Sequence, residues 1–542
     1  MNMKLFVAST IWKRQRSKID ILNKYIFFYA IMIIQTKDYD TFYVGSKHFV
    51  GALKASKALV GDSVEITEEP DVCVSKILSR AEHINLVGTL EISGKTKYGF
   101  TSRNVPIYLF IPYNEAYPPF YVGSSHIDKR KNLLVVIDFD SWSETANCPR
   151  GICKRILGAS GNLEAEKEAL KIHTHSINWK HICELNPSTP FFQGGSYLDT
   201  DTFHVDPEGC VDIDDAISIW SNNSYIEVRI HIADVASLLA NNKFLWNASK
   251  LGETLYNNGK IVSPLFPVKV QEMCSLTPNT LRPTFTLAFT WNIETNSIVK
   301  KWWSQQDIVV KYSYNYESIL NTQWAPLLKT IASGISSKSV TDPHEWIAEL
   351  MIFYNKEAAK VIQGSQQGIL RRHSEPDKEL LNALEKTGLA PFLAYKAGTY
   401  CDATENDVVH WGLNEAVYTH ATSPIRRWVD CINQAILIQT LFIAEFTVPP
   451  YTIESINKQS KLCKSFERDN FFLKMLLSKG KIIVTGQVIL AGPQKAKIWI
   501  PVWNRCVSIY EYRMTGEFVE ISFHMNPSKR NWKRKIILEI LE

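Results

Sequence analysis

After residue 32, the first part of the chain alternates apolar and polar residues over short stretches separated by glycine and charge. Four of these stretches are predicted to be strands, at residues 42–44, 62–66, 86–90 and 133–137. No long helical period interrupts them. Many short strands at close spacing are typical of small β-barrels.

Beyond residue 160 the period of the apolar pattern changes several times. Residues 163–171, 346–355 and 451–477 have the spacing of helices. Further strands are predicted at residues 216–220, 225–232, 285–291, 481–489 and 496–501. The chain therefore combines β-rich parts with a part that holds both helices and strands.

Two local patterns bear on function. Tyr312, Tyr314 and Tyr316 share one face if their segment is extended, and there they either stack on bases or pack in the core. Ser423 and Pro424 predict a helix start, with the serine as cap and the proline at the first helical position. Arg426 would then oppose the helix dipole, which makes sense if both face an anion.

Composition limits the class of protein. The 542 residues are 45% hydrophobic and 21% charged, values of a folded chain with three or four domains. The net charge of +5 is mild, so a polyanion would have to meet local patches. Ten cysteines include no CxxC pair, which favours reduced thiols. The apolar run 25–34 is half the roughly twenty residues of a membrane helix, so no membrane partner is expected.

The densest chemistry lies in residues 203–215, where Asp206, Asp212, Asp214 and Asp215 fall within ten positions. Carboxylates this close repel one another, so they either stay in water or share a hard divalent cation. A strand predicted directly after them favours the cation, because it would hold the loop rigidly. A calcium EF-hand does not fit, since the loop has Ile217 where that motif needs glycine.

The same aspartates, with Pro207, resemble the signature of the ribonuclease II / ribonuclease R family (the RNB domain), which includes the catalytic subunit of the exosome. Three further blocks resemble the family and follow in its order, at residues 231–235, 274–276 and 418–430. The resemblance implies an α+β multidomain fold: amino-terminal cold-shock-type OB β-barrels, a central α/β RNB catalytic domain and a carboxy-terminal OB-fold barrel.

The resemblance also suggests domain boundaries. Residues 1–31 would be a dispensable extension, with Met32 as an alternative start, and no endonuclease domain is recognisable before the barrels. The predicted domains are two cold-shock-type OB folds at 32–85 and 86–160, a connector at 161–195, the RNB catalytic domain at 196–478 and an RNA-binding OB fold at 479–542.

The implied activity is processive 3′–5′ hydrolysis of single-stranded RNA to 5′-mononucleotides by a two-metal mechanism with Mg²⁺, for which Mn²⁺ would substitute. The implied partner is RNA with a free 3′ end, and the protein would be a cytoplasmic or nuclear monomer able to join an RNA-processing complex. The implied catalytic residues are Asp206, Asp212, Asp214, Asp215 and Arg426, with the four aspartates as metal ligands. The implied RNA contacts are Tyr256, Tyr314, Glu349 (at the ribose), Arg371, His420, Ser423 and Arg427.

Two alternatives stay open. The family usually has His-Arg where this chain has Gln434-Ala435, which allows a catalytically weak or inactive RNA-binding protein. Spacing alone also allows a magnesium-dependent nuclease that acts on DNA.

The lysines of 451–477 form either a solvated face or an RNA contact. The tail 529–535 mixes cations with Trp532, as single-strand binders often do.

Overall fold

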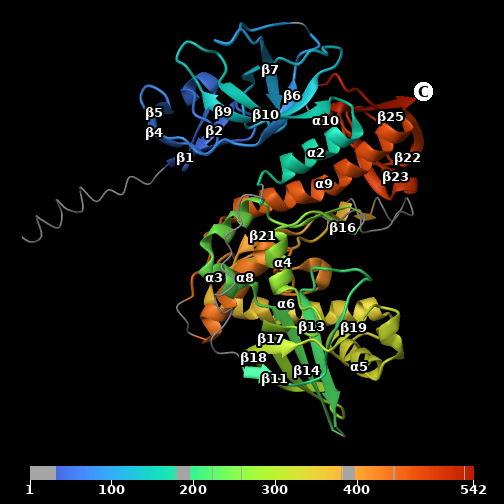
Figure 1. The fold of residues 1–542 in the computed structure, drawn as a ribbon. Helices are drawn as coiled ribbons and strands as arrows, with labels where there is room; N and C mark the ends of the chain where they lie inside the picture. Colours follow the sequence, from blue (N-terminus) through green and yellow to red (C-terminus); the bar gives the residue numbers. More distant parts are fainter. Residues whose placement is uncertain are drawn as a thin grey trace, which may run out of the picture. The chain divides into compact units, whose positions relative to one another are not determined.

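The computed structural model describes residues 32–541 except 95, 178, 180–195, 223, 258, 380, 383–396, 443–445 and 530–531. The predicted extension 1–31 and most of the apolar run 25–34 lie outside the described residues. The chain forms two compact units, one of residues 1–169 and 526–535 and the other of residues 170–525 and 536–542 (Figure 1). Each unit is described separately below.

The first unit begins with a five-stranded antiparallel sheet in the order β3-β2-β1-β4-β5. Its strands are β1 (Met32–Thr36), β2 (Thr41–Val44), β3 (Lys47–Val50), β4 (Ser63–Thr67) and β5 (Cys73–Ser79). Apolar residues on alternate positions, such as Ile34, Phe42 and Val64, fill its core. The strands predicted at 42–44 and 62–66 are confirmed.

A closed barrel follows in the same unit, with the strand order β10-β8-β7-β6-β9. Its strands are β6 (Leu86–Leu90), β7 (Ile107–Pro112), β8 (Phe120–Gly123), β9 (Leu133–Ser141) and β10 (Arg150–Ala159). Gly88 permits the close approach of β6 and β7, because a Cβ there would collide with the carbonyl oxygen of Ile111. The barrel predicted from short alternating strands is confirmed.

The carboxy-terminal tail corrects one prediction. Helix α10 (Trp532–Lys535) belongs to the first unit, and Trp532 is buried rather than available to a base. Lys535 is fully buried, and its Nζ lies 2.7 Å from Glu166 Oε1 and 3.0 Å from the hydroxyl of Tyr113. Trp532 and Lys535 are therefore packing residues, while Lys529 and Arg534 remain exposed.

The second unit is built on a seven-stranded sheet with the order β11-β18-β17-β14-β13-β12-β19. Its strands are β11 (Ser196–Leu198), β12 (Thr202–Val205), β13 (Asp215–Ser221), β14 (Tyr225–Ala233), β17 (Leu281–Asn292), β18 (Ser297–Val309) and β19 (Tyr312–Tyr314). The predicted strands at 216–220, 225–232 and 285–291 correspond to β13, β14 and β17. Most of their buried residues are apolar, which places this sheet at the centre of the largest core.

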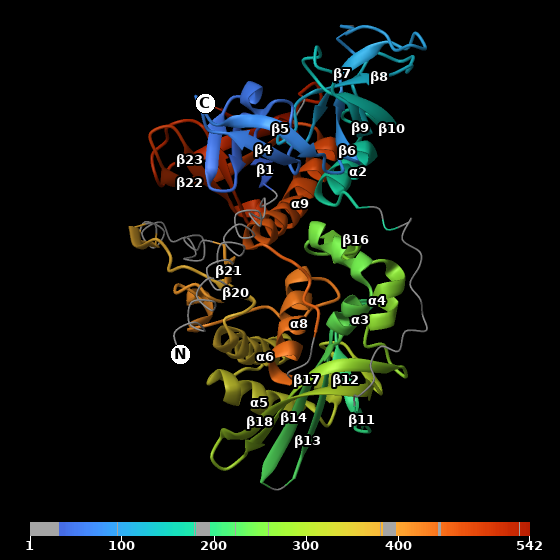
Figure 2. The ribbon, with the colours of Figure 1, turned by 90° about the vertical axis from the view of Figure 1, so that its left-hand side faces the viewer.

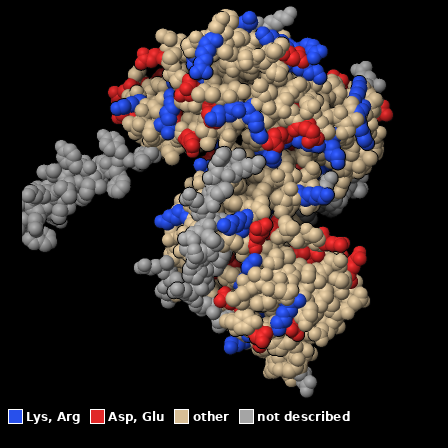
Figure 3. All heavy atoms as spheres, in the orientation of Figure 1, with Lys and Arg blue, Asp and Glu red and all other residues tan. Residues whose placement is uncertain are grey.

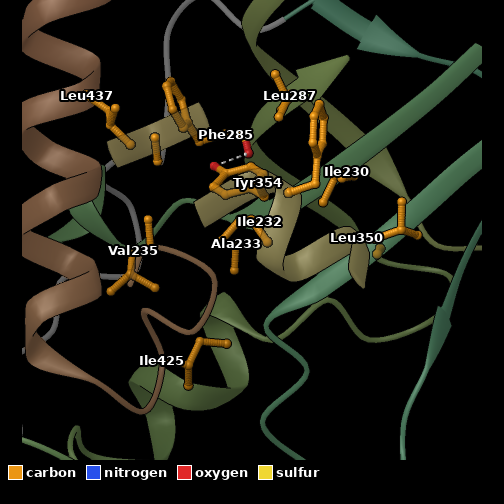
Figure 4. Packing of buried hydrophobic residues seen from close by; sticks show 14 of the residues in the cluster. Ile230, Ile232, Ala233, Val235, Phe285, Leu287, Leu350, Tyr354, Ile425 and Leu437 are labelled. Atoms are coloured by element: carbon orange, nitrogen blue, oxygen red, sulfur yellow. Dashed lines mark hydrogen bonds between the residues drawn. The ribbon is translucent and has the colours of Figure 1, made fainter. Parts of the chain in front are cut away.

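Helices pack beside this sheet (Figures 1 and 2). They are α3 (Val235–Asn241), α4 (Val268–Cys274), α5 (Ala325–Ser336), α6 (Pro343–Ser365) and α8 (Trp428–Phe442). Tyr354 of α6 lies among apolar side chains and donates its hydroxyl to the carbonyl of Phe285 at 3.2 Å (Figure 4). This bond satisfies a buried polar group that would otherwise destabilise the core.

Two short hairpins, a long helix and a last sheet complete the unit. The hairpins pair β15 (Leu255–Asn257) with β16 (Lys260–Ser263) and β20 (Ile369–Arg372) with β21 (Thr399–Asp402); the helix is α9 (Ile453–Lys479). The sheet has the order β24-β23-β22-β25-β26, with β22 (Ile482–Ala491), β23 (Ala496–Ile500), β24 (Arg505–Ile509), β25 (Phe518–Met525) and β26 (Ile536–Leu541). The predicted helix at 451–477 and strands at 481–489 and 496–501 are confirmed.

The surface carries both signs of charge. On the face drawn in Figure 3, Lys and Arg are mixed with Asp and Glu rather than gathered into one large field. Any recognition of a polyanion therefore depends on particular side chains rather than on the charge of the whole molecule.

Among the described helices, none is long and apolar enough to span a lipid bilayer.

Candidate active site

The acidic segment connects two neighbouring strands of the large sheet. Strand β12 ends at Val205 and β13 begins at Asp215, and the two strands pair antiparallel with Phe203 opposite Ile217. Two residues further along this register, Val205 faces Asp215, so Asp206 and Asp215 come from adjacent strand ends. The backbone N–H of Asp206 donates to the carbonyl of Tyr314 at 3.0 Å, which anchors this end of β12 to β19.

The loop between the two strands is held by the block at 274–276. Ser275 Oγ accepts from the N–H of Ile213 at 3.0 Å and donates to the carbonyl of Val211 at 2.9 Å. The N–H of Leu276 donates to the carbonyl of Ile213 at 3.0 Å. These three bonds fix the backbone on both sides of Asp212. The structural role of the 274–276 block is therefore to hold the acidic loop.

Asp214 joins the acidic segment to the distant 418–430 block. Its Oδ1 accepts from the N–H of Ile425 at 2.8 Å, and its Oδ2 accepts from Arg426 Nε at 3.1 Å. Ile425 itself is anchored in the buried cluster that contains Val235 (Figure 4). Two of the predicted catalytic residues, 212 positions apart in sequence, are therefore in direct contact.

Burial and crowding raise the pKa of two of the carboxyl groups. Burial raises the pKa of Asp214 to about 7, against the opposing effect of Arg426. Burial, with Asp206 and Asp214 as neighbouring negative charges, raises the pKa of Asp215 well above its ordinary value. The ionised forms of these carboxyl groups are therefore disfavoured, and a bound cation would remove much of that electrostatic cost.

The other two aspartates also have side-chain partners, and one of those of Asp212 is the Cys210 thiol, 3.6 Å from its Oδ1. Tyr256 donates its hydroxyl to Asp212 Oδ2, and His204 Nδ1 lies 2.9 Å from Asp206 Oδ2. Burial and hydrogen bonding to Asp212 raise the pKa of Tyr256, so this hydroxyl keeps its proton. Tyr256 was predicted to contact RNA, and the structure places it at the acidic loop itself.

The donor set fits a hard divalent cation, which prefers carboxylate oxygens. Asp206 and Asp215 are the least engaged of the four, while Asp214 already binds Ile425 and Arg426. Among the described residues, however, no three His, Cys, Asp or Glu side chains are arranged to hold one ion. The chemistry of the donors matches a metal site, but the carboxylates would have to move closer together to form it.

The helix predicted to begin at Ser423 is a wrong prediction. Residues 424–426 form a turn, in which the carbonyl of Ser423 accepts from the N–H of Arg427 at 2.9 Å, and α8 begins only at Trp428. The N–H of Ser423 donates to Asp430 Oδ1 at 2.8 Å, and this bond holds the turn in place of a helix cap. Arg426 is oriented by Asp214 and by Ser423 Oγ, to which its Nη2 donates at 3.0 Å, rather than by a helix dipole.

Adjacent arginines of this turn face different partners. The Arg426 side chain is 46% exposed, so part of its guanidinium is free to meet a substrate. Arg427 Nη2 donates to Asp430 Oδ1 at 2.9 Å, and the Asp430 carboxylate is fully buried. Arg427 therefore has a structural partner, whatever further contact it makes with RNA.

The departure at 434–435 has a defined structural role. Gln434 Oε1 accepts from the N–H of Ala236 at 3.0 Å, and Gln434 Nε2 donates to the carbonyl of Ala233 at 2.9 Å. The N–H of Ala233 in turn donates to the carbonyl of Asp214 at 2.9 Å. Gln434 thus fixes the end of β14 that pairs with the acidic segment. From the sequence alone, Gln434 was recognised only as a departure from the residue that the family usually has there.

The remaining predicted RNA residues fall into three places. Arg371 and His420 lie together, since the Arg371 guanidinium covers the ring of Tyr400 at 4.8 Å and the Tyr400 hydroxyl lies 2.8 Å from His420 Nδ1. Tyr314 is on β19, stacked against Tyr312 at 6.4 Å, so these two tyrosines share a face as predicted. Tyr316 lies beyond the strand and stacks on His344 at 3.7 Å. Glu349 of α6 lines a cavity of about 280 Å³ with Lys356 and Glu415.

Comparison with known protein families fits this geometry. The family model of the RNB domain matches residues 196–323 and 328–443, which contain all four aspartates and Arg426. The chain therefore contains an RNB domain in these residues. A second model, the Dis3-like cold-shock domain 2, matches residues 107–175, ahead of the RNB domain.

Among curated proteins, the chain is similar to the exosome complex exonuclease RRP44 of Mus musculus, with 24% identity over 461 residues, 68% of this chain and 47% of that protein. The exosome complex exonuclease dis3 of Schizosaccharomyces pombe is 23% identical over 492 residues, 71% of this chain and 50% of the relative. The chain thus spans about half the length of these curated relatives.

Solved structures share the fold. The RNase R of Mycoplasma genitalium, in complex with ribose methylated single-stranded RNA, aligns with a TM-score of 0.67 and 16% identity over 94% of this chain and 100% of that chain. Yeast Ssd1, described as a pseudonuclease, aligns with a TM-score of 0.60 and 16% identity over 91% of this chain and 81% of its own. The predicted α+β multidomain fold, with OB-type barrels around an RNB domain, is confirmed.

Proposed function

We propose that this RNB-domain protein is a 3′–5′ exoribonuclease that hydrolyses single-stranded RNA processively to 5′-mononucleotides with Mg²⁺. The observation that carries the proposal is the contact of Asp214 with Ile425 and Arg426, which brings the acidic segment and the arginine turn into one site. The similarity to RRP44 and dis3, both named exonucleases, supports the same reaction.

Each part of the reaction has a candidate group in this site. Water attacks the phosphorus of the last internucleotide linkage, the bond from phosphorus to the 3′ oxygen breaks, and that oxygen takes a proton. Bound Mg²⁺ would supply an activated water and neutralise the leaving oxygen. Asp206 and Asp215 are the best placed to hold it, while Asp212 is oriented by Tyr256.

Arg426 supplies the donors for the charge that develops on the phosphate. Its Nε is bound to Asp214 and its Nη2 to Ser423, so its orientation is set before substrate arrives. Preoriented donors in a partly buried site lower the barrier because they need no reorganisation during the reaction. Asp214, with both oxygens engaged, acts as the residue that positions this arginine.

The proposal is tested with purified full-length protein, Mg²⁺ and RNA labelled at its 5′ end. Because the proposed hydrolysis is processive, we expect the full-length band to be replaced by a short 5′-labelled end product with few intermediates. Uniformly labelled RNA should release 5′-mononucleotides, and EDTA should stop both reactions. DNA of the same sequence should be a much poorer substrate, because a DNA-specific nuclease is the alternative that spacing alone allows. Internal cleavage, or equal rates on DNA, would contradict the proposal.

A second candidate is an RNA-binding protein without nuclease activity. The observation that favours it is that no three-ligand metal arrangement exists among the described residues. It predicts single-stranded RNA binding with no product at any Mg²⁺ or Mn²⁺ concentration. The same gel assay therefore separates the two functions.

A further inference from the structure

Several cations lie on one side of the 251–256 segment. One of them, Lys464, lies outside all the sequence blocks that resemble the RNB family. We infer that Lys464 of α9, together with Arg371, binds a backbone phosphate of the RNA strand other than the scissile one. The inference deepens the proposed function and rests on it. Its support comes from the placement of α9, the unbalanced charge of the cluster and its distance from the acidic site.

Helix α9 is fixed against β21 by a side-chain amide. The N–H of Tyr400 donates to Asn457 Oδ1 at 2.8 Å, and Asn457 Nδ2 donates to the carbonyl of Tyr400 at 2.8 Å. Lys464 follows Asn457 by seven residues, or about two helical turns, so both lie on one face of α9. One turn before Lys464, Ser460 Oγ donates to Glu253 Oε1 at 2.8 Å. These contacts place Lys464 on the face of α9 that meets β21 and the 251–256 segment, about 10 Å along the helix from Asn457.

The cluster has more positive than negative charge. Its cations are Arg371, stacked on Tyr400 at 4.8 Å, Lys464, and Arg427, which is paired with Asp430. Within the part of the chain that the structure describes, no carboxylate forms an ion pair with Arg371 or Lys464. A polyanion would supply the missing negative charge.

Titration of the neighbouring groups agrees with this charge balance. Burial, followed by Arg427, Arg371 and Lys464, lowers the pKa of His420 well below its ordinary value. Partial burial and the nearby Arg371 lower the pKa of Lys464. Burial is the largest cause of both shifts, and the neighbouring cations add to it, while Glu253 opposes the shift of Lys464.

The cluster lies too far from the acidic loop to act on the bond that breaks. Tyr256 contacts Asp212, whereas Glu253, three residues earlier on the same segment, contacts Ser460 on α9. Three residues of extended chain span roughly 10 Å. One phosphate cannot contact both Lys464 and the acidic loop, so the RNA would run from Lys464 to Arg426 along the 251–256 segment.

The test is the salt dependence of RNA affinity. Full-length protein is titrated into a 5′-labelled single-stranded oligouridylate in EDTA, at several KCl concentrations. Loss of one phosphate contact with single-stranded RNA should reduce the slope of log affinity against log salt by about 0.7. We expect this reduction, with a several-fold weaker affinity, for Lys464→Ala and Lys464→Gln, and a near-normal slope for Lys464→Arg.

Lys458→Ala is the matched control, because Lys458 is an exposed lysine of the same helix on a different face. Its slope and its hydrolysis rate at saturating RNA should equal those of the unmodified protein, whereas Lys464→Ala is judged by its slope and its affinity. The inference is overturned if Lys464→Ala leaves the slope unchanged while the protein still binds and hydrolyses RNA. Failure of the unmodified protein to bind any RNA would instead overturn the proposed function, and this inference with it.

Discussion

At the scale of single residues, two neighbouring arginines do different work. Arg426 is half exposed and reaches from Asp214 towards solvent, while Arg427 neutralises the buried Asp430. The resemblance names both residues, but only the three-dimensional contacts separate an arginine that can meet substrate from one that supports the fold. The sequence could not show this, because Asp214 lies 212 positions from Arg426 and because the turn that orients the arginines was predicted as a helix.

Replacing Arg426 should therefore act on turnover. We expect Arg426→Ala to lower the single-turnover hydrolysis rate by roughly a hundredfold or more, the scale of losing one transition-state donor, with little change in RNA affinity. Arg426→Lys should recover only part, because an ammonium cannot make two parallel bonds to a phosphate. A loss that appears only in affinity would contradict this role.

Replacing Arg427 should act on stability. Arg427→Ala leaves the buried Asp430 carboxylate without its cation, although Ser423 still donates to it. We expect a loss of about 2–4 kcal/mol in unfolding free energy, measured by urea denaturation. Arg427→Lys should lose less, and a fully stable Arg427→Ala protein would show that the pair is not structural.

A buried histidine gives a prediction for pH. His231 is fully buried, shares hydrogen bonds with Ser218 and Thr286, and burial lowers its pKa to about 3. In the unfolded chain it takes a proton near pH 6.5, so protonation favours unfolding as the pH falls from 6.5 towards 3. The stability from this group is full above pH 6.5 and is lost as pH falls.

The measurement is urea denaturation at pH 6.5 and 4.5. Over this interval His231 should remove about 2 kcal/mol of stability, at 1.36 kcal/mol for each unit of pKa difference. In His231→Gln, which cannot take up this proton, the loss between the two pH values should be smaller by that amount. Equal losses in both proteins would show that His231 is not the acid-sensitive group.

At the scale of elements, regular structure was predicted well and connections were not. Strands β13, β14 and β17 follow from their apolar runs, and α9 follows from its helical period. The turn at 424–426 was predicted as a helix because Ser423 and Pro424 favour a cap locally. A tertiary bond from the N–H of Ser423 to Asp430 prevailed over that local preference.

The amide of Gln434 couples α8 to β14. Gln434→Leu would leave the N–H of Ala236 and the carbonyl of Ala233 buried without partners, at a cost of about 1–3 kcal/mol for each group. We expect a lower unfolding midpoint and a lower hydrolysis rate, because Ala233 bonds to Asp214. Gln439→Leu, a half-buried residue of the same helix, is the control and should change neither. A Gln434→Leu protein as stable and active as the unmodified one would disprove the coupling.

At the scale of the whole molecule, the fold class and the order of its parts were predictable, since each family block lies in its own stretch of sequence. The burial of Trp532 and Lys535 in the tail was not predictable, because it depends on partners far away in sequence. Lys535 and Trp532 have the composition of an RNA-binding segment, yet Glu166 and Tyr113 bind this lysine inside the first unit.

Breaking this buried pair should destabilise the first unit. Lys535→Met leaves the buried Glu166 carboxylate unpaired, and we expect a loss of about 3–5 kcal/mol in the thermal or urea unfolding of that unit. Lys535→Met combined with Glu166→Gln should recover much of it, because no buried charge is left. If Lys535→Met lowered the RNA affinity without changing the stability, the tail would be an RNA-binding segment after all.

The most direct test of the central claim is the single-turnover hydrolysis rate of Asp215→Asn on single-stranded RNA with Mg²⁺, measured beside its RNA affinity. Asp215 lies at the end of β13, next to Asp206 and Asp214, where the negative charge is most crowded. The account predicts a fall in rate of at least a hundredfold with an affinity within about threefold of the unmodified protein. A variant that keeps more than a tenth of the rate would contradict an active site built on these aspartates.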